Sequence, residues 1–169
     1  MKKNIAAFVL CVLSLLLAAC TSTGSGSRTA LTLRDAIEQS AERTAGELPK
    51  GSRVAIVAFE SENDRLSEYI MEELNGALFD RGIEVADRQN LEYALQELNF
   101  QMSMYVSDES ALSIGKFLGA DIVITGALTG FGDMYRFRAN ALNVETAARV
   151  SMSRFDVRND QTLRRMTGK

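Results

Sequence analysis

The run of six consecutive apolar residues from Val54 to Phe59 constrains the fold of this chain more than any other segment. A strand of this composition carries apolar side chains on both faces, so it must be covered on both sides, as in the sheets of α/β proteins. A second stretch, Ile122 to Leu128, also predicts a buried strand. The sequence therefore predicts an α/β domain in which helices cover the sheet.

Apolar residues spaced by three and four positions predict four helices beside these strands. The first runs from about Leu33 to Leu48. Residues that favour helix N-termini precede or begin the four segments, namely Thr32, Asp64, Asp87 and Ser107. Three further strands are expected at 83–86, 135–144 and 148–157. The predicted fold is a mixed sheet of about five strands, flanked by about four helices and ending in a long antiparallel hairpin.

The pattern of apolar residues predicts the register of the final hairpin, because these residues change face at matching positions in both strands. If the turn centres on Thr146, Phe137 pairs with Phe155 and Leu142 pairs with Val150. The face that carries the two phenylalanines also carries small residues, and we expect it to receive a helix. The opposite patch is either covered by another helix or offered to a partner. Its members are Leu142, Val144, Ala148, Val150 and Met152.

The N-terminal segment predicts a lipoprotein signal peptide over residues 1–19. Two lysines precede an apolar stretch that is too short to span a membrane, which takes about 20 apolar residues. The stretch closes with Leu17-Ala18-Ala19-Cys20, which resembles the lipobox of bacterial lipoproteins. We expect cleavage between Ala19 and Cys20, and a covalent lipid on Cys20 that anchors the chain.

The predicted mature chain has a short tether and one domain. Residues 20–30 comprise the lipidated cysteine and a Ser/Thr/Gly-rich tether, whose flexible residues span about 18 Å on average. Residues 31–169 form a single domain that is long enough to bury a core without a disulfide. Thr21 is not the aspartate associated with inner-membrane retention in many Gram-negative bacteria. We therefore expect a position on the periplasmic face of the outer membrane.

The chain contains no histidine, and its two cysteines are assigned to the signal peptide and the lipid anchor. This composition excludes Ser-His-Asp and Cys-His triads and an ordinary zinc site with histidine ligands. We therefore expect neither an enzyme nor a metal protein. Apart from the lipid on Cys20, no cofactor is expected.

Charge is unevenly distributed along the chain. Residues 31–110 carry 17 acidic and 7 basic side chains, whereas residues 111–169 carry 5 acidic and 9 basic ones. Arginine is favoured where carboxylates are recognised, so we expect a docking surface on the final hairpin. A solvated sheet face explains the arginines equally well, and nothing indicates nucleic-acid binding. The candidate partner-binding residues are Arg136, Arg138, Leu142, Val144, Val150, Met152 and Arg154.

Two smaller groups of residues have alternative interpretations. Glu60, Glu62 and Asp64 follow the first predicted strand and could hold a cation, but a solvated loop before a helix explains them as well. Gly126, Gly130 and Gly132 could suggest a phosphate-binding loop. A strand follows them, rather than the helix N-terminus that would hold the anion, so glycines of a hairpin are the favoured interpretation.

The order and spacing of several segments resemble the CsgG/LpoB-like family of bacterial envelope lipoproteins. These segments are Arg53–Phe59, Val85–Leu91, Ser107–Gly126 and Arg136–Val157, and the resemblance covers roughly residues 31–160. The family includes the curli secretion channel subunit and an outer-membrane activator of penicillin-binding proteins. The resemblance implies a periplasm-facing α/β domain without catalytic residues that acts through protein contacts.

Two departures from the family narrow the expected function. Its channel subunits have extra amphipathic segments that insert into a membrane, for which the predicted mature chain has no spare strands. Its activators have a long Pro-rich tether, whereas Pro49 is the only proline here.

We expect a non-enzymatic accessory lipoprotein that regulates peptidoglycan synthesis or serves envelope secretion or assembly. Its partner would be a penicillin-binding protein or a secretion component. The alternative is a self-assembling ring or array lipoprotein of a secretion or flagellar apparatus.

Overall fold

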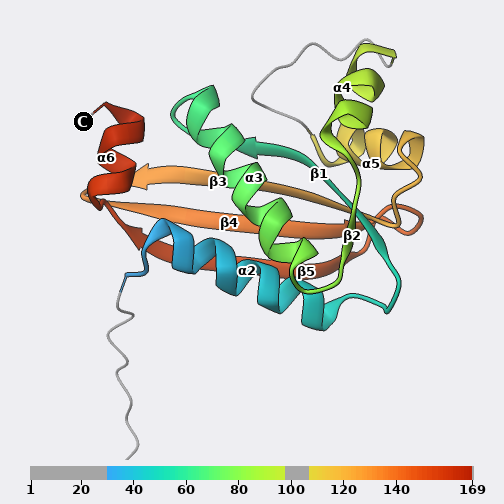
Figure 1. Ribbon diagram of the computed structural model, residues 1–169, viewed down its shortest axis with the longest axis horizontal. Coiled ribbons are helices and arrows are strands. Elements are labelled where there is room, and N and C mark those ends of the chain that lie inside the picture. Colours follow the sequence, from blue (N-terminus) through green and yellow to red (C-terminus); the bar gives the residue numbers. More distant parts are fainter. Residues whose placement is uncertain (1–29, 98–106, 169) are drawn as a thin grey trace, which may run out of the picture.

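A computed structural model describes residues 30–97 and 107–168, which form a five-stranded mixed sheet with helices packed on it (Figure 1). The strand order is β2-β1-β3-β4-β5, with β1 parallel to β2 and β3 and the last three strands antiparallel. The predicted fold class is therefore confirmed. The strands are β1 (Arg53–Glu60), β2 (Glu84–Val85), β3 (Ile122–Phe131), β4 (Met134–Asn143) and β5 (Arg149–Arg158).

The four predicted helices are present, and the C-terminal segment adds a fifth. In this helix, α6 (Gln161–Thr167), the Asp160 carboxylate accepts the backbone N–H of Leu163 at 3.0 Å, and the Leu163 side chain is buried. This short helix was not predicted because it has only one buried apolar residue. The helices are α2 (Leu33–Glu47), α3 (Asp64–Phe79), α4 (Arg88–Glu97), α5 (Asp108–Phe117) and α6 (Gln161–Thr167).

Side-chain caps define where the helices begin. Thr32 and Asp35 form a capping box at the start of α2, and Ser107 caps α5. The cap predicted at Asp64 is wrong by one residue, because Asn63 Oδ1 accepts the N–H of Leu66 at 3.0 Å. Asp64 is instead the first helical residue, where its charge is favourable near the positive end of the helix dipole.

Alternate residues of the central strands enter two separate cores. Ile56 and Ile124 pack beneath α2 and α3, whereas Val57 and Val123 pack against α4 and α5 on the other face. This division is the physical consequence of the continuous apolar runs in β1 and β3. In Figure 1, α2 and α3 lie along one face of the sheet, and α4 and α5 lie together near one end.

The register of the final hairpin is confirmed at its root and wrong near its tip. Phe137 lies opposite Phe155, as predicted, but Leu142 lies opposite Arg149 and not opposite Val150. The register shifts by one residue at this point, so Val150 is an extra residue in β5. Its half-buried side chain therefore packs with the core beneath α2 and α3.

Two independent constraints produce this bulge. At the turn, Asn143 Oδ1 accepts the N–H groups of Glu145 and Thr146, and the Asn143 N–H bonds to the Ala148 carbonyl at 2.8 Å. At the root, the buried Phe137 ring must lie opposite Phe155. The two pairings differ in register by one residue, and the strand accommodates the difference with an unpaired residue near its start.

Candidate functional site

The final hairpin has one covered side and one open side. The covered side packs against α2, which contacts both β4 and β5. Buried Ser151 and Ser153 lie on it, so the prediction that this face receives a helix is confirmed. On the open side, alternate residues of the two strands point away from α2. We call this surface the arginine face, defined by Arg136, Arg138, Met152, Arg154 and Asp156.

Two arginines occupy directly opposite positions on the arginine face. Arg138 of β4 pairs with Arg154 of β5, and both side chains are exposed. Side chains at such positions have Cβ atoms about 5 Å apart, and like charges there destabilise a sheet. An acidic group bound between the two guanidinium groups would relieve this repulsion and accept hydrogen bonds from both.

Arg136 is held in a different way. Its guanidinium Nε lies 3.2 Å from Asp156 Oδ1 across the β4–β5 ladder, and its Cζ lies 5.0 Å from the centre of the Phe131 ring. The Phe131 side chain is itself largely exposed. Arg136 is therefore oriented before any partner binds, between a carboxylate and an aromatic ring.

Two hollows lie beside the arginine face. One, of about 590 Å³, runs from Arg136 and Arg154 over the edge of β5 to α2, where Arg43 donates to the Met152 carbonyl at 3.1 Å. Another, of about 150 Å³, is lined by Glu60, Arg138 and others. The face therefore combines guanidinium groups, an exposed thioether and concave surface, which suits a protein partner better than a small substrate.

The structure brings together only some of the predicted partner-binding residues. Arg136, Arg138, Met152 and Arg154 share the arginine face. Leu142 is only 4% exposed, and it joins half-buried Val144 in the core beneath α5. Val150 packs on the other side of the sheet, as described above. The apolar patch predicted at the hairpin tip is thus not a single surface.

Two of the other sequence candidates, Glu62 and Gly126, have structural roles. Glu62 accepts a hydrogen bond from the Tyr135 hydroxyl at 3.1 Å. Gly126 lies against the Phe59 ring.

In residues 30–97 and 107–168, no three acidic, histidine or cysteine side chains could together hold a metal ion. No helix of these same segments is long and apolar enough to cross a membrane. The predicted signal peptide, Cys20 and all but the last residue of the predicted tether lie outside the described residues.

Two further features of the structure were not predicted from the sequence. Ser113 and Lys116 have the Ser-x-x-Lys spacing of some serine hydrolases, but both are exposed on α5, and the Ser113 hydroxyl donates to the Glu109 carbonyl at 3.0 Å. Asp156 was not predicted as the partner of Arg136. Its position opposite Arg136 follows from the Phe137–Phe155 pairing, since their neighbours must also be opposite.

Several solved structures are similar to this chain, among them the following three. The C-terminal domain of LpoB from Salmonella enterica is 17% identical, with a TM-score of 0.65 over 75% of this chain and 98% of that one. The C-terminal domain of LpoB from Escherichia coli is 18% identical, with a TM-score of 0.62 over 74% and 97%. Lipoprotein GNA1162 from Neisseria meningitidis is 14% identical, with a TM-score of 0.52 over 66% and 82%.

These likenesses establish an LpoB-like fold. The part of the predicted resemblance that concerns LpoB is confirmed at the level of the fold, while the part that concerns the curli channel is not supported by these structures. No protein-family model matches the chain, and no curated protein matches its sequence.

Proposed function

We propose that this chain is a non-enzymatic lipoprotein of the cell envelope, and that its domain binds an acidic surface of another envelope protein through the arginine face. Its role would be that of an LpoB-like accessory, which regulates a penicillin-binding protein or serves a secretion or assembly apparatus. The lipid on Cys20 would hold the domain at the periplasmic face of the outer membrane.

The pairing of Arg138 with Arg154 carries this proposal. Two exposed arginines directly opposite each other cost stability, and nearby Arg136 already has its own carboxylate in Asp156. A bound carboxylate would turn this repulsion into charge-assisted hydrogen bonds. The LpoB-like fold and the lipobox-like segment support an envelope location for this contact.

Charge reversal on the arginine face tests the proposed contact. The double variant Arg138→Glu/Arg154→Glu should no longer bind the partner. The control variant Arg65→Glu/Arg165→Glu makes the same charge change at exposed positions outside the face, and it should still bind the partner. The measurement is in-cell photo-crosslinking from position 152, with identification of the captured protein by mass spectrometry. Thermal unfolding of both variants checks that the fold persists.

The identity of the crosslinked protein decides between the candidate functions. A penicillin-binding protein or a secretion component, captured by the wild type and lost with the face variant, supports the proposal. Capture only of a second copy of this chain would favour the self-assembling alternative. Equal capture by both double variants would remove the arginine face from consideration.

The lipid anchor has its own test. Replacement of Cys20 by Ala should abolish incorporation of labelled palmitate and move the protein from the membrane fraction to the periplasmic fraction, because two or more acyl chains give stable anchorage. Retention of the variant in the membrane fraction would contradict the predicted anchor without affecting the proposed contact.

A further inference from the structure

The edge of the sheet at β5 is closed at two points and open between them. At one point Leu31 bonds to the Asp156 carbonyl and the Arg158 N–H, both at 2.9 Å. At the other point Arg43 of α2 donates to the Met152 carbonyl at 3.1 Å. Figure 1 shows α2 lying alongside β5, which it contacts. The stretch of β5 between these two points has neither form of cover.

Arg154 lies in this open stretch. The carbonyl groups of Met152 and Asp156 both point away from β4, because each accepts a bond from outside the β4–β5 ladder. Outward backbone groups recur at every second residue of an antiparallel strand, so the N–H and C=O of Arg154 also point away from β4. Within the part of the chain that the structure describes, no hydrogen bond reaches either group from beyond the edge. Arg154 therefore offers a donor and an acceptor to an extended chain.

The hollow of about 590 Å³ between α2 and the arginine face opens beside Arg154. Its volume is in the range of ligand-binding clefts. The charged residues of its lining are Arg43, Arg136, Arg154 and Asp156. Asp156 already forms an ion pair with Arg136, and among the described residues neither Arg43 nor Arg154 forms one. The hollow therefore carries two positive charges without a counter-charge.

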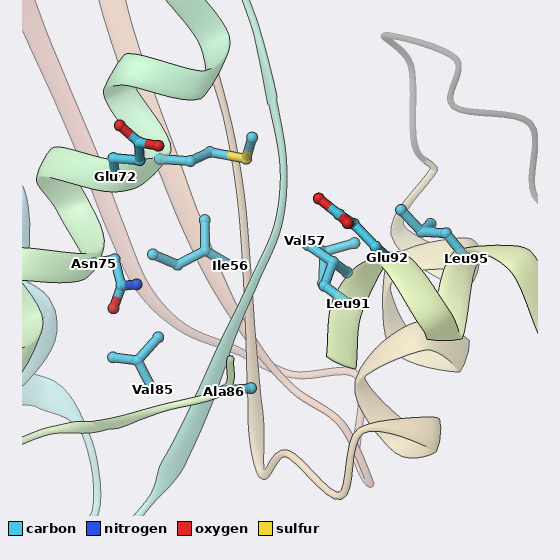
Figure 2. A pocket seen from close by; sticks show the side chains of 10 residues that line it. Ile56, Val57, Glu72, Asn75, Val85, Ala86, Leu91, Glu92 and Leu95 are labelled. Atoms are coloured by element: carbon cyan, nitrogen blue, oxygen red, sulfur yellow. The ribbon is translucent and has the colours of Figure 1, made fainter. Parts of the chain in front are cut away.

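The groove along β1 has a different chemistry. It lies between α3 and α4, has a volume of about 100 Å³, and is lined mostly by apolar side chains such as Ile56, Val57 and Leu95 (Figure 2). Apolar walls accept many kinds of side chain and specify no particular partner. The guanidinium groups of Arg43 and Arg154 in the hollow at β5 instead specify an acidic occupant.

We propose that the acidic partner contributes an extended segment that pairs with the open edge of β5 at Arg154. Its backbone would donate to the Arg154 carbonyl and accept from the Arg154 N–H. Because side chains alternate along an extended chain, acidic ones would lie beside the Arg154 guanidinium and apolar ones would contact Phe155 on the side of α2. Arg43, where the open stretch ends, would bind a further carboxylate. Addition of a strand to a sheet edge is a recurrent mode of peptide recognition.

This inference rests on the proposed function and adds two features to it. One is the form of the acidic group, which is an extended segment rather than a folded surface. From Met152 to Asp156 the open stretch measures about 13 Å, at about 3.3 Å per residue, so the segment needs only a few residues. The other is a role for Arg43, which belongs to α2 and lies outside the arginine face.

A synthetic peptide tests this mode of binding. The probe is a capped, fluorescent peptide of about seven residues that alternates glutamate with valine, titrated to about 1 mM and followed by fluorescence anisotropy. The protein is the predicted mature chain with Cys20→Ser, produced without its signal peptide so that it carries no lipid. Binding should protect the Arg154 amide from hydrogen exchange. The same peptide with N-methylated backbone nitrogens should bind about fivefold more weakly, because it cannot donate to the Arg154 carbonyl.

Two arginines of α2 provide the matched control. Arg43→Glu should weaken peptide binding about fivefold or more, because it reverses a charge in the hollow. Arg34→Glu makes the same charge change at an exposed position of the same helix outside the hollow, and it should change binding little. Unfolding curves check that both variants fold. A peptide that alternates lysine with valine should not bind.

Failure of this inference can be distinguished from failure of the proposed function. Equal binding by Arg43→Glu and Arg34→Glu, or equal binding of the N-methylated peptide, would overturn the pairing with β5. The arginine face would still be supported if Arg138→Glu/Arg154→Glu no longer captured the partner in cells.

Three other results would also overturn the inference. Absence of binding at about 1 mM peptide would show that the edge does not accept this chemistry. An Arg154 amide that is already fully protected in the free chain would show that the chain itself occupies the edge. Self-association that Arg43→Glu abolishes, with no peptide binding, would assign the hollow to a second copy.

Discussion

Arg136 and Asp156 face each other on β4 and β5, with the guanidinium Nε 3.2 Å from the carboxylate Oδ1. The side chains are 40% and 29% exposed, so we expect Asp156→Asn to lower the free energy of unfolding by less than about 1 kcal/mol. The same change removes a negative charge from the arginine face. Binding of a polyglutamate peptide should therefore tighten, and titration calorimetry can measure it.

A matched substitution separates local from overall charge in this experiment. Asp80→Asn makes the same charge change at an exposed residue just after α3. If both variants strengthen polyglutamate binding equally, the effect comes from net charge, and Asp156 has no special relation to the arginine face.

The second prediction concerns Gly126, where β3 passes beneath the Phe59 ring. A Cβ at this position would lie 2.2 Å from Phe59 Cε2 and 2.5 Å from the Arg138 carbonyl oxygen. Gly126→Ala should therefore destabilise the domain by about 1–3 kcal/mol, measured by denaturant unfolding. Phe59→Leu in the same chain should restore only part of the loss, since the backbone oxygen of Arg138 cannot move away. Full restoration would show that only the ring opposes the new methyl group.

The third prediction contrasts two helical glycines. Gly76 of α3 has open space around its Cβ position, so Gly76→Ala should raise the free energy of unfolding by about 0.5–1 kcal/mol through helix propensity. A Cβ at Gly115 of α5 would lie 2.2 Å from Val123 Cγ1, and Gly115→Ala should therefore destabilise. Because the obstacle is a side chain, Val123→Ala should relieve much of the strain in the double variant. Thermal unfolding of the wild type, Gly115→Ala, Val123→Ala and the double variant gives the coupling free energy between the two positions.

Much of the fold could be predicted because it depends on local patterns. The apolar run from Val54 to Phe59 required cover on both faces, and Thr32 and Ser107 are helix caps whose chemistry acts within three residues. The pairing of Phe137 with Phe155 followed from the alternation of apolar residues alone.

The rest could not be predicted, because it depends on distant parts of the chain meeting. The bulge at Val150 arises because the turn at Asn143 and the phenylalanine pair impose registers one residue apart. In the sequence alone, this one-residue shift looks the same as a change of face by all the apolar residues at the hairpin tip. The cover of Leu142 by α5 and the groove along β1 likewise depend on where helices of another part of the chain lie.

The final prediction concerns pH and the capping box of α2. The Thr32 hydroxyl donates to Asp35 Oδ2 at 2.6 Å, and the Thr32 backbone N–H donates to the same oxygen at 3.3 Å. These hydrogen bonds, that of the side chain first, hold the pKa of Asp35 below its usual value. Because the pKa is lower in the folded state, this contribution to stability is complete above about pH 4 and is lost as pH falls through the folded-state pKa.

Thr32→Ala should therefore raise the pKa of Asp35 toward the ordinary aspartate value, as measured by an NMR titration of its carboxyl carbon. Thr32→Ser keeps the hydroxyl and should preserve the lowered pKa. The wild type and the Ser variant should lose stability more steeply below about pH 4 than the Ala variant does. An unchanged Asp35 pKa in Thr32→Ala would show that the carboxylate is stabilised by something other than its cap partner, such as the charge of Arg158.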